Sequence, residues 1–559
     1  MSAIVQARPV DRVEAPSGGE RFAWIGLVAL AAAVRAGRIG EPPLDPGEAA
    51  RALEAWTLWH EGRVAYAVGP LMTNLLSLVF GLFSAGDGQA RLVSVVAGVG
   101  TVAAAWWLRP GLGRLGAWCA AALLAACPAL VVASRTATPA VLVACCALLT
   151  ATCGYRFARE QDGRWLTGAV SSALLGLAAD PSFTVVIGSL ALALAVAEGD
   201  RLAHPLWWAA MRRGAPRAIG IALLLAVVVD TRFLMNPNGL GAGVFDPLWA
   251  WSVDVVRGGG LVAPIMLLLV DGGAFALAMI GLATFRSYPR TAGLLGTWLL
   301  VSTVVATVMR QPDLRYLVQP LIPAALLGGL GLGRLLETLR ARGSARSTVF
   351  GLVGLVPLLA AGFQINAGLR SGQDPWASGG LVMLVGLLIV ALAAINWLPR
   401  AELGSASATF ILIVVTLWTI TTGSRLLEAR GGPRAHLLDA AVLTDDIDAV
   451  REEARKWLRA DPGGTIRVDP SLRPLVAWSL RDVPTAIFDG SAAQASGPRL
   501  LAEPAAGADL RTRRVIVGYA AERRTLDLSP ARVWRWVIGR ASLVEVRPYA
   551  ILVVQSAGG

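Results

Sequence analysis

The sequence alternates long apolar runs with short polar segments. Runs such as 317–335 and 378–397 carry almost no charge, and each approaches the roughly 20 residues that cross about 30 Å of hydrocarbon. We therefore predict α-helices that cross a membrane about thirteen times. The predicted spans lie near 22–37, 90–108, 115–132, 139–156, 165–179, 182–197, 217–235, 259–285, 291–309, 317–335, 348–368, 378–397 and 406–424.

One apolar run, Pro70–Phe83, is too short to be a span of this kind. We predict that it forms a helix lying in the membrane interface, within an outer loop over 38–89. A crossing at this point would move every later loop to the opposite side of the membrane.

The basic residues indicate which loops face the cytoplasm. Arginines gather in every second loop, and the positive-inside rule makes these loops cytoplasmic. This alternation requires that Pro70–Phe83 does not cross. It places the tail 1–21 in the cytoplasm and the C-terminal region 425–559 outside. The basic loops hold, among others, Arg8, Arg12, Arg21, Arg109, Arg114, Arg156, Arg159, Arg164, Arg212, Arg213, Arg286, Arg290, Arg340, Arg342 and Arg400.

Composition agrees with a multi-pass protein of the cell membrane. Hydrophobic residues make up 55% of the 559 residues, charged residues only 16%, and the mean hydropathy is +0.59. The net charge of +12 does not indicate nucleic acid as a partner, because the arginines are spread over loops rather than gathered on one face. All five cysteines fall in predicted spans, so no disulfide framework is expected. The first apolar run lacks a cleavage pattern and is interpreted as an uncleaved span.

The predicted outer loop 38–89 carries an unusual set of polar residues. Pro46 and Gly47 open a helical run over Glu48–Glu61, with Asp45 directly before it. Elsewhere, Asp230 and Asp271 lie near span ends. We expect them to reach water, because a buried carboxylate at mid-membrane is costly.

The region after 425 has the pattern of a small extramembrane α/β domain. Ile447–Arg459 has helical spacing. Four stretches have the composition of strands: Thr465–Val468, Thr485–Phe488, Arg514–Val517 and Tyr549–Val554. The region contains no phosphate-binding loop, metal-spaced His/Cys cluster or nucleophile elbow. The predicted fold class is thus a polytopic α-helical membrane protein. Its membrane domain spans 22–424, and the small α/β domain follows over 425–559.

Several short motifs, in their order and spacing, carry a family resemblance over nearly the whole chain. They are Glu48-Ala49 with Glu61-Gly62, Gly69-Pro70-Leu71, Ala90-Arg91-Leu92, Leu112-Gly113-Arg114, Ser134-Arg135, Asn236-Pro237-Asn238-Gly239, Arg315-Tyr316 and Trp478-Ser479-Leu480-Arg481-Asp482. The N-terminal half resembles the GT-C membrane glycosyltransferases, which include the protein O-mannosyltransferases and the aminoarabinose transferases of lipid A. The whole chain more narrowly resembles the flippase-activity-associated glycosyltransferase-like proteins of prokaryotic surface-glycan clusters.

The resemblance implies transfer of a sugar from a polyprenyl-phosphate donor to a glycan or protein acceptor on the outer face of the membrane. Such a reaction needs a carboxylate, either as general base or to hold a divalent cation, and cationic groups for the lipid phosphate. The family's outer loop carries an adjacent Asp-Glu pair, which falls on Gly47 and Glu48. Its second acidic position falls on Ala140. The missing carboxylates leave an alternative function open, a non-catalytic relative that binds lipid-linked glycan or assists its export.

The candidate site residues have structural interpretations beside the functional ones. We predict Asp45 and Glu48 as catalytic carboxylates, with a helix cap as the alternative role. Phosphate binding is predicted for Arg135, Arg310, Arg315 and Tyr316, with interfacial anchoring as the alternative. No metal ligands are assigned, since the chain has only three histidines. The cofactor stays unknown, and the resemblance leaves room for a divalent cation.

Overall fold

The computed structural model describes most of the chain between residues 18 and 428 and six segments of the C-terminal region. The gaps before 428 are 42, 63, 65, 67–68, 233, 237–238, 240, 242, 244–248, 250, 253–261, 284–288, 310–313 and 372–374. The described C-terminal segments are 447–483, 485–488, 499–502, 514–518, 529–537 and 549–554. Of the predicted site residues, Arg310 lies outside the described part.

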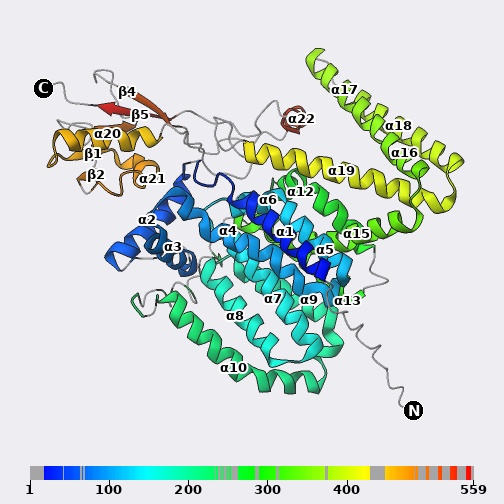
Figure 1. Ribbon diagram of the computed structural model, residues 1–559, viewed down its shortest axis with the longest axis horizontal. Coiled ribbons are helices and arrows are strands. Elements are labelled where there is room, and N and C mark those ends of the chain that lie inside the picture. Colours follow the sequence, from blue (N-terminus) through cyan, green and yellow to red (C-terminus); the bar gives the residue numbers. More distant parts are fainter. Residues whose placement is uncertain are drawn as a thin grey trace.

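A helix lies at every predicted span. The helices of this part are α1 (Gly18–Ala36), α2 (Pro46–Glu61), α3 (Pro70–Phe83), α4 (Asp87–Ala104), η1 (Ala105–Leu108), α5 (Arg109–Ala126), α6 (Pro128–Ser134), α7 (Ala140–Glu160), α8 (Gly163–Ala179), α9 (Phe183–Leu202), α10 (Pro205–Asp230), α12 (Val262–Leu282), α13 (Pro289–Val308), α14 (Leu314–Leu317), α15 (Leu321–Arg342), α16 (Ala345–Val353), α17 (Leu355–Ser371), α18 (Trp376–Trp397) and α19 (Arg400–Glu428). Figure 1 shows them as one bundle from which the pair α17 and α18 projects.

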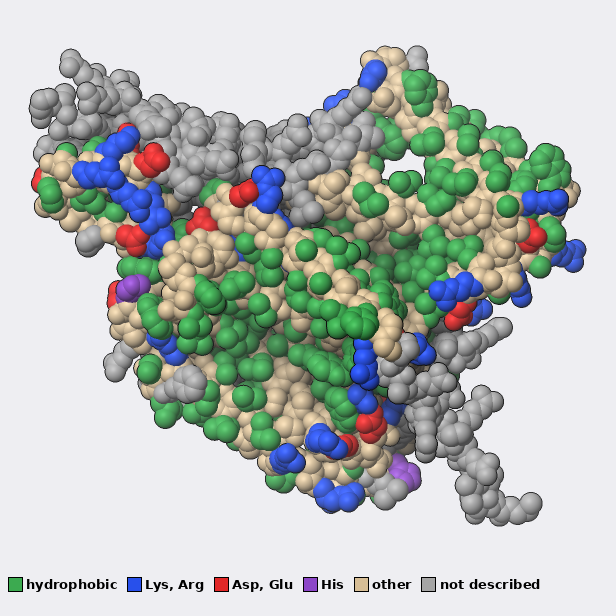
Figure 2. All heavy atoms as spheres, viewed as in Figure 1, with side chains coloured by type: hydrophobic (Ala, Val, Ile, Leu, Met, Phe, Trp, Pro, Cys, Tyr) green, Lys and Arg blue, Asp and Glu red, His purple; other side chains and the backbone are tan. Residues whose placement is uncertain are grey.

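Nine helical segments among the described residues are long and apolar enough to cross a membrane. The chain is therefore a multi-pass membrane protein, and the count of thirteen spans stays a prediction. Figure 2 shows hydrophobic side chains over the middle of one face, with charged side chains mostly toward its edges. This distribution suits a bundle surrounded by lipid.

The predicted span 115–132 is interrupted. Helix α5 ends at Ala126, and α6 begins at Pro128 after Cys127 with φ −57° and ψ 113°. The break follows from Pro128, which disfavours helical backbone in the residue before it. A second break occurs inside α5 at Gly113, whose φ of 73° and ψ of 170° suit glycine alone.

Helix α15 forms the centre of the bundle. Within the segment Leu314–Arg342, 94% of the most apolar stretch is buried. Helix α15 packs closely against α12 and α5. Glycines permit this approach. A Cβ at Gly331 would lie 2.2 Å from the carbonyl oxygen of Leu277, and one at Gly329 would lie 2.7 Å from that of Gly116. Small residues at helix contacts are typical of membrane bundles, where dispersion replaces the hydrophobic effect as the driving force.

Loops predicted to share a side of the membrane contact one another. On the predicted cytoplasmic side, Glu20 forms ion pairs with Arg109 and Arg114. On the predicted outer side, the Arg232 guanidinium donates to the Leu58 carbonyl at 2.8 Å. Both ends of α3 also contact predicted outer segments. Gly69 packs against the end of α8, and Gly88, in the first turn of α4, packs against Gly40. These contacts support the prediction that α3 does not cross.

The C-terminal region contains a five-stranded mixed sheet in the order β2-β1-β3-β5-β4. Its strands are β1 (Ile466–Val468), β2 (Ala486–Phe488), β3 (Arg499–Ala502), β4 (Arg514–Gly518) and β5 (Tyr549–Val554). The pairs β1–β2 and β1–β3 are parallel, and β3–β5 and β4–β5 are antiparallel.

Four strands lie within a residue of the predicted ranges, whereas β3 was not predicted from the sequence. The helices of the region are α20 (Ile447–Ala460), η3 (Pro470–Leu472), α21 (Arg473–Val476) and α22 (Pro530–Val537). Buried apolar residues of α20, β1 and β3, among them Val450, Ala454, Ile466 and Leu500, form a core apart from that of the bundle. That the region forms a separate domain stays a prediction.

Candidate functional site

The helix α2 begins with a reciprocal pair of hydrogen bonds between the two predicted carboxylates. Asp45 is the N-cap, and its Oδ1 accepts the Glu48 backbone N–H at 2.8 Å. Glu48 Oε2 accepts the Asp45 backbone N–H at 3.0 Å. Pro46 takes the first helical position, where a missing N–H has no cost. The helical run predicted over Glu48–Glu61 is confirmed, and it starts two residues earlier.

Glu48 is buried and held from three sides. Arg91 of α4 donates from Nη2 to Oε2 at 2.7 Å and from Nε to Oε1 at 3.0 Å. The backbone N–H of Ala137, in the loop after α6, donates to Oε1 at 2.6 Å. The side chains of Glu48 and Arg91 are each 2% exposed. A carboxylate with these partners is well placed to fix the geometry around it, which favours a positioning role over direct contact with a substrate.

Asp45 is more accessible than Glu48, being only partly buried. A Cβ built on Gly47 would lie 3.1 Å from Asp45 Oδ1 and 3.7 Å from Arg51 Nη1. The carboxylate of Asp45 therefore lies beside the place where a side chain at position 47 would begin. Arg51 was missed by the sequence reasoning, and it donates to the carbonyls of Gly47 and Ala137 at 3.1 and 3.0 Å. We call the group Asp45, Gly47, Glu48, Arg51 and Arg91 the Asp45 site.

The predicted phosphate-binding residues lie in two places. Arg135 is close to the Asp45 site, because its loop supplies Ala137. Its Nη1 donates to the Val34 carbonyl at the end of α1 at 2.8 Å. Arg315 of α14 forms an ion pair with Asp180 at 3.3 Å, with 26% of its side chain exposed. Tyr316 is 3% exposed and packs among apolar residues, which favours a packing role.

Two carboxylates expected to reach water are buried. Asp271 is 3% exposed, and it accepts the Cys127 thiol at 3.1 Å and the Ala129 N–H at 3.3 Å. The backbone of α12 is non-helical at Asp271, and the side chain of this residue contacts the start of α6. Asp230 is 1% exposed, and no described residue donates a hydrogen bond to its carboxylate. The expectation failed because distance along a helix does not show what other helices cover its end.

Asp230 ends α10 beside a polar cluster that also includes Tyr66, Asn74 and Asn236. The Tyr66 hydroxyl donates to Asn74 Oδ1 at 2.8 Å, and Asn74 Nδ2 donates to the Val229 carbonyl at 2.6 Å. Burial raises the pKa of the Tyr66 hydroxyl, so it stays protonated and can donate at neutral pH. The cluster joins the loop before α3 to the end of α10. The resemblance motif at Asn236 was the sequence signal for this place.

The described residues contain no group of three or more His, Cys, Asp or Glu that could hold a metal ion. The Asp45 site has two carboxylates, and one of them is already paired with Arg91. The residues present therefore do not fit a protein-bound cation.

Comparisons with known proteins agree with this architecture. The family model described as dolichyl-phosphate-mannose-protein mannosyltransferase matches residues 67–238. ArnT from Cupriavidus metallidurans, in a crystal structure bound to undecaprenyl phosphate, has a TM-score of 0.52 and 16% identity, covering 85% of this chain and 87% of that chain. The apo structure of the same protein has a TM-score of 0.50 and 16% identity, covering 86% and 93%. No curated protein sequence matches the chain.

The chain thus shares the fold of ArnT over most of its length. The family match adds a sequence resemblance to the dolichyl-phosphate-mannose-protein mannosyltransferases over residues 67–238, and membership of the GT-C superfamily stays a prediction. The narrower resemblance to the flippase-activity-associated proteins stays a prediction.

Proposed function

We propose that this protein transfers a sugar from a polyprenyl-phosphate donor to an acceptor on the outer face of the cytoplasmic membrane. The fold shared with ArnT, which was solved with undecaprenyl phosphate bound, supports a lipid-linked donor. The observation that carries the proposal is the position of Asp45. Its carboxylate lies 3.1 Å from where a side chain at Gly47 would begin, and the resemblance implies the family's aspartate at that position.

In this proposal Asp45 is the general base. Its carboxylate takes the proton of the acceptor hydroxyl as the acceptor oxygen bonds to the anomeric carbon, and the bond from that carbon to the phosphate oxygen breaks. Polyprenyl phosphate leaves with the electron pair of the broken bond. Glu48 is a positioning residue, because it binds the Asp45 N–H while Arg91 and Ala137 hold its carboxylate in place.

Cationic groups have the second role. Arg135, close to the Asp45 site, and the partly exposed Arg315, which lies elsewhere on α14, are the candidates for contact with the lipid phosphate, since a guanidinium binds phosphate with charge-assisted hydrogen bonds. Arg51 joins them in this proposal because it lies 3.7 Å from the same Gly47 position. In this proposal the C-terminal region and the Asp45 site lie on the same, outer side of the membrane, because the basic loops on the other side are expected to face the cytoplasm.

A paired measurement of donor binding and sugar transfer on the purified protein tests the proposal. Lipid-linked sugars extracted from membranes serve as donors. We expect Asp45→Asn to lower turnover by about 100-fold or more, the usual contribution of a general base, with donor binding unchanged. The matched control is Asp162→Asn, which alters the N-cap of α8 on the predicted cytoplasmic side and should leave transfer intact.

A relocation variant makes the test sharper. In the double variant Asp45→Ala with Gly47→Asp, the carboxylate begins at the position that the family resemblance implies, so we expect transfer to recover relative to Asp45→Ala alone. Transfer that is insensitive to Asp45→Asn would rule out the assigned base. Donor binding without transfer in the unmodified protein would favour the non-catalytic relative, for which the buried Ala140 at the family's second acidic position is the supporting observation.

A further inference from the structure

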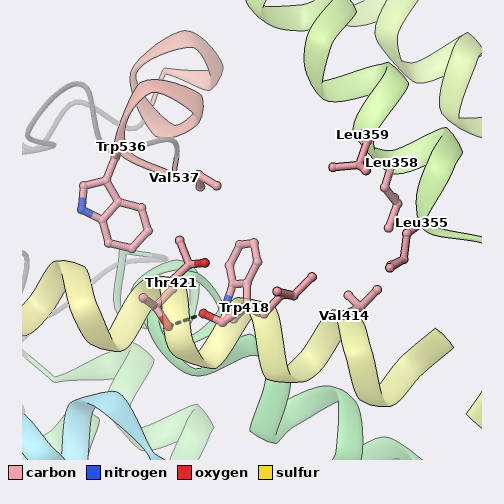
Figure 3. Close-up of a pocket in the computed structure, with 10 residues that line it drawn as sticks. Leu355, Leu358, Leu359, Val414, Trp418, Thr421, Trp536 and Val537 are labelled. Carbon is pink, nitrogen blue, oxygen red and sulfur yellow. Dashed lines mark hydrogen bonds between the residues drawn. The ribbon is translucent and has the colours of Figure 1, made fainter. Parts of the chain in front are cut away.

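An apolar cavity of about 260 Å³ lies between α17, α19 and α22 (Figure 3). Its wall includes Leu355, Leu358, Val414, Trp418, Thr421 and Trp536. No charged residue is among the described residues that line it. The volume exceeds the roughly 150 Å³ of an engineered apolar cavity that takes up benzene, so a stretch of hydrocarbon chain fits.

The medium around this cavity is lipid. Helices α16 to α19 belong to segments long and apolar enough to cross a membrane. On α17, Leu359 at the cavity and Phe363 one turn later are 73% and 75% exposed. Large apolar side chains exposed on a span face hydrocarbon rather than water. A cavity that opens here is therefore accessible to a lipid chain.

Helix α22 closes one side of the cavity and carries a basic residue on its exposed face. Trp536 is 8% exposed and reaches α19 beside Thr421, as Figure 3 shows. Trp534 lies 3.4 Å from where a Cβ on Gly362 of α17 would begin. The remaining face of α22 carries Arg535, which is exposed, and the helix has no acidic residue. Tryptophan with arginine on a short amphipathic helix is the composition of a segment at the headgroup level.

We propose that this cavity binds one acyl chain of an anionic bilayer phospholipid, with the phosphate of the lipid at the basic face of α22. The occupant is a resident lipid and not the sugar donor, because α2 with the Asp45 site and α17 lie toward opposite ends of the long axis in Figure 1. The bound lipid fastens the C-terminal region to the spans α17 and α19.

Native mass spectrometry of the full-length protein tests this site. The protein is released from nanodiscs that contain equal amounts of phosphatidylglycerol and phosphatidylcholine, and we expect one retained phosphatidylglycerol. Val414→Phe and Leu358→Phe each fill the cavity and should lose that lipid. Leu384→Phe on α18, at a position 65% exposed and outside the cavity wall, is the matched control and should keep it. Arg535→Gln should retain a lipid but lose the preference for phosphatidylglycerol.

Two outcomes would overturn the proposal. One is equal lipid retention in the filled variants and the Leu384→Phe control, which would place the bound lipid elsewhere. The other is displacement of the retained phospholipid by added polyprenyl phosphate, which would assign the cavity to the donor. Two filling variants are included so that misfolding of one leaves the other to decide. Neither outcome depends on sugar transfer, so the result stands apart from that of the Asp45 variants.

Discussion

Trp478 donates its indole N–H to Oδ1 of Asp87 at 2.7 Å, although the two residues are 391 positions apart. Arg481 donates a hydrogen bond from Nη2 to the Ala85 carbonyl at 2.8 Å. Its guanidinium carbon lies 3.8 Å from the centroid of the Trp478 ring. The C-terminal region thus docks on the junction of α3 and α4. Asp87 is one helical turn before Arg91, which holds Glu48, so the docking contact and the Asp45 site share the first turns of α4.

We expect Trp478→Phe to loosen this docking. The substitution removes the hydrogen bond to a carboxylate, worth about 1.5–3 kcal/mol, but keeps an aromatic ring against Phe80. Hydrogen exchange of α21 and β1 should become faster, while exchange within α15 stays unchanged. Trp397→Phe, at a position 74% exposed on α18, is the control. Equal exchange in α21 for both variants would show that the contact does not hold the region.

The ion pair between Glu48 and Arg91 should be important for stability. Both side chains are 2% exposed, and removing one partner of a buried pair leaves an unpaired buried charge at a cost of about 3–5 kcal/mol. Glu48→Gln and Arg91→Met should each lower the melting temperature in detergent clearly. Glu41→Gln, which breaks the exposed pair with Arg38, should leave the melting temperature unchanged. A melting temperature unaffected by Arg91→Met would contradict a structural role for the pair.

Gly113 should tolerate no other residue without loss of stability. Its φ of 73° and ψ of 170° lie in a region used almost only by glycine, so Gly113→Ala should cost about 1–3 kcal/mol. The space around it is open, with nothing within 4 Å of an added Cβ, so the loss would come from the backbone alone. Gly154→Ala in α7 also adds its methyl to open space and should stabilise the protein slightly. Thermal unfolding distinguishes the two.

The sidedness of the loops is testable by cysteine labelling. Gly463→Cys, in the exposed turn after α20, should react with an impermeant maleimide in intact cells if the C-terminal region lies outside. Ala341→Cys, exposed near the end of α15, should react only after the membrane is permeabilised. The unmodified protein, with its five cysteines, gives the background. Reversed labelling of the two positions would show that the N-terminal tail is outside.

Local chain geometry was predictable to about a residue in several places. Pro46 at the start of α2, with Asp45 before it, is a signal contained in adjacent residues. The four predicted strands of the C-terminal sheet were recognised for the same reason. The helix break at Cys127, which was not predicted, also has a local cause, because Pro128 disfavours helical backbone in the residue before it. It was missed because the apolar run continues through both residues. Strand β3, with the sequence Arg-Leu-Leu-Ala, has no alternation of polar and apolar residues to identify it.

By itself the sequence determined the membrane class and the helices at each span, because long apolar runs in lipid can satisfy their backbone only as helices. It also placed Asp45 and Glu48 at the start of one helix. What the tertiary structure decided is how those side chains are used. Burial of Glu48 depends on Arg91 and Ala137, 43 and 89 positions away, and burial of Asp230 and Asp271 depends on packing by other helices. Such contacts join segments far apart in the chain, and no local pattern of residues encodes them.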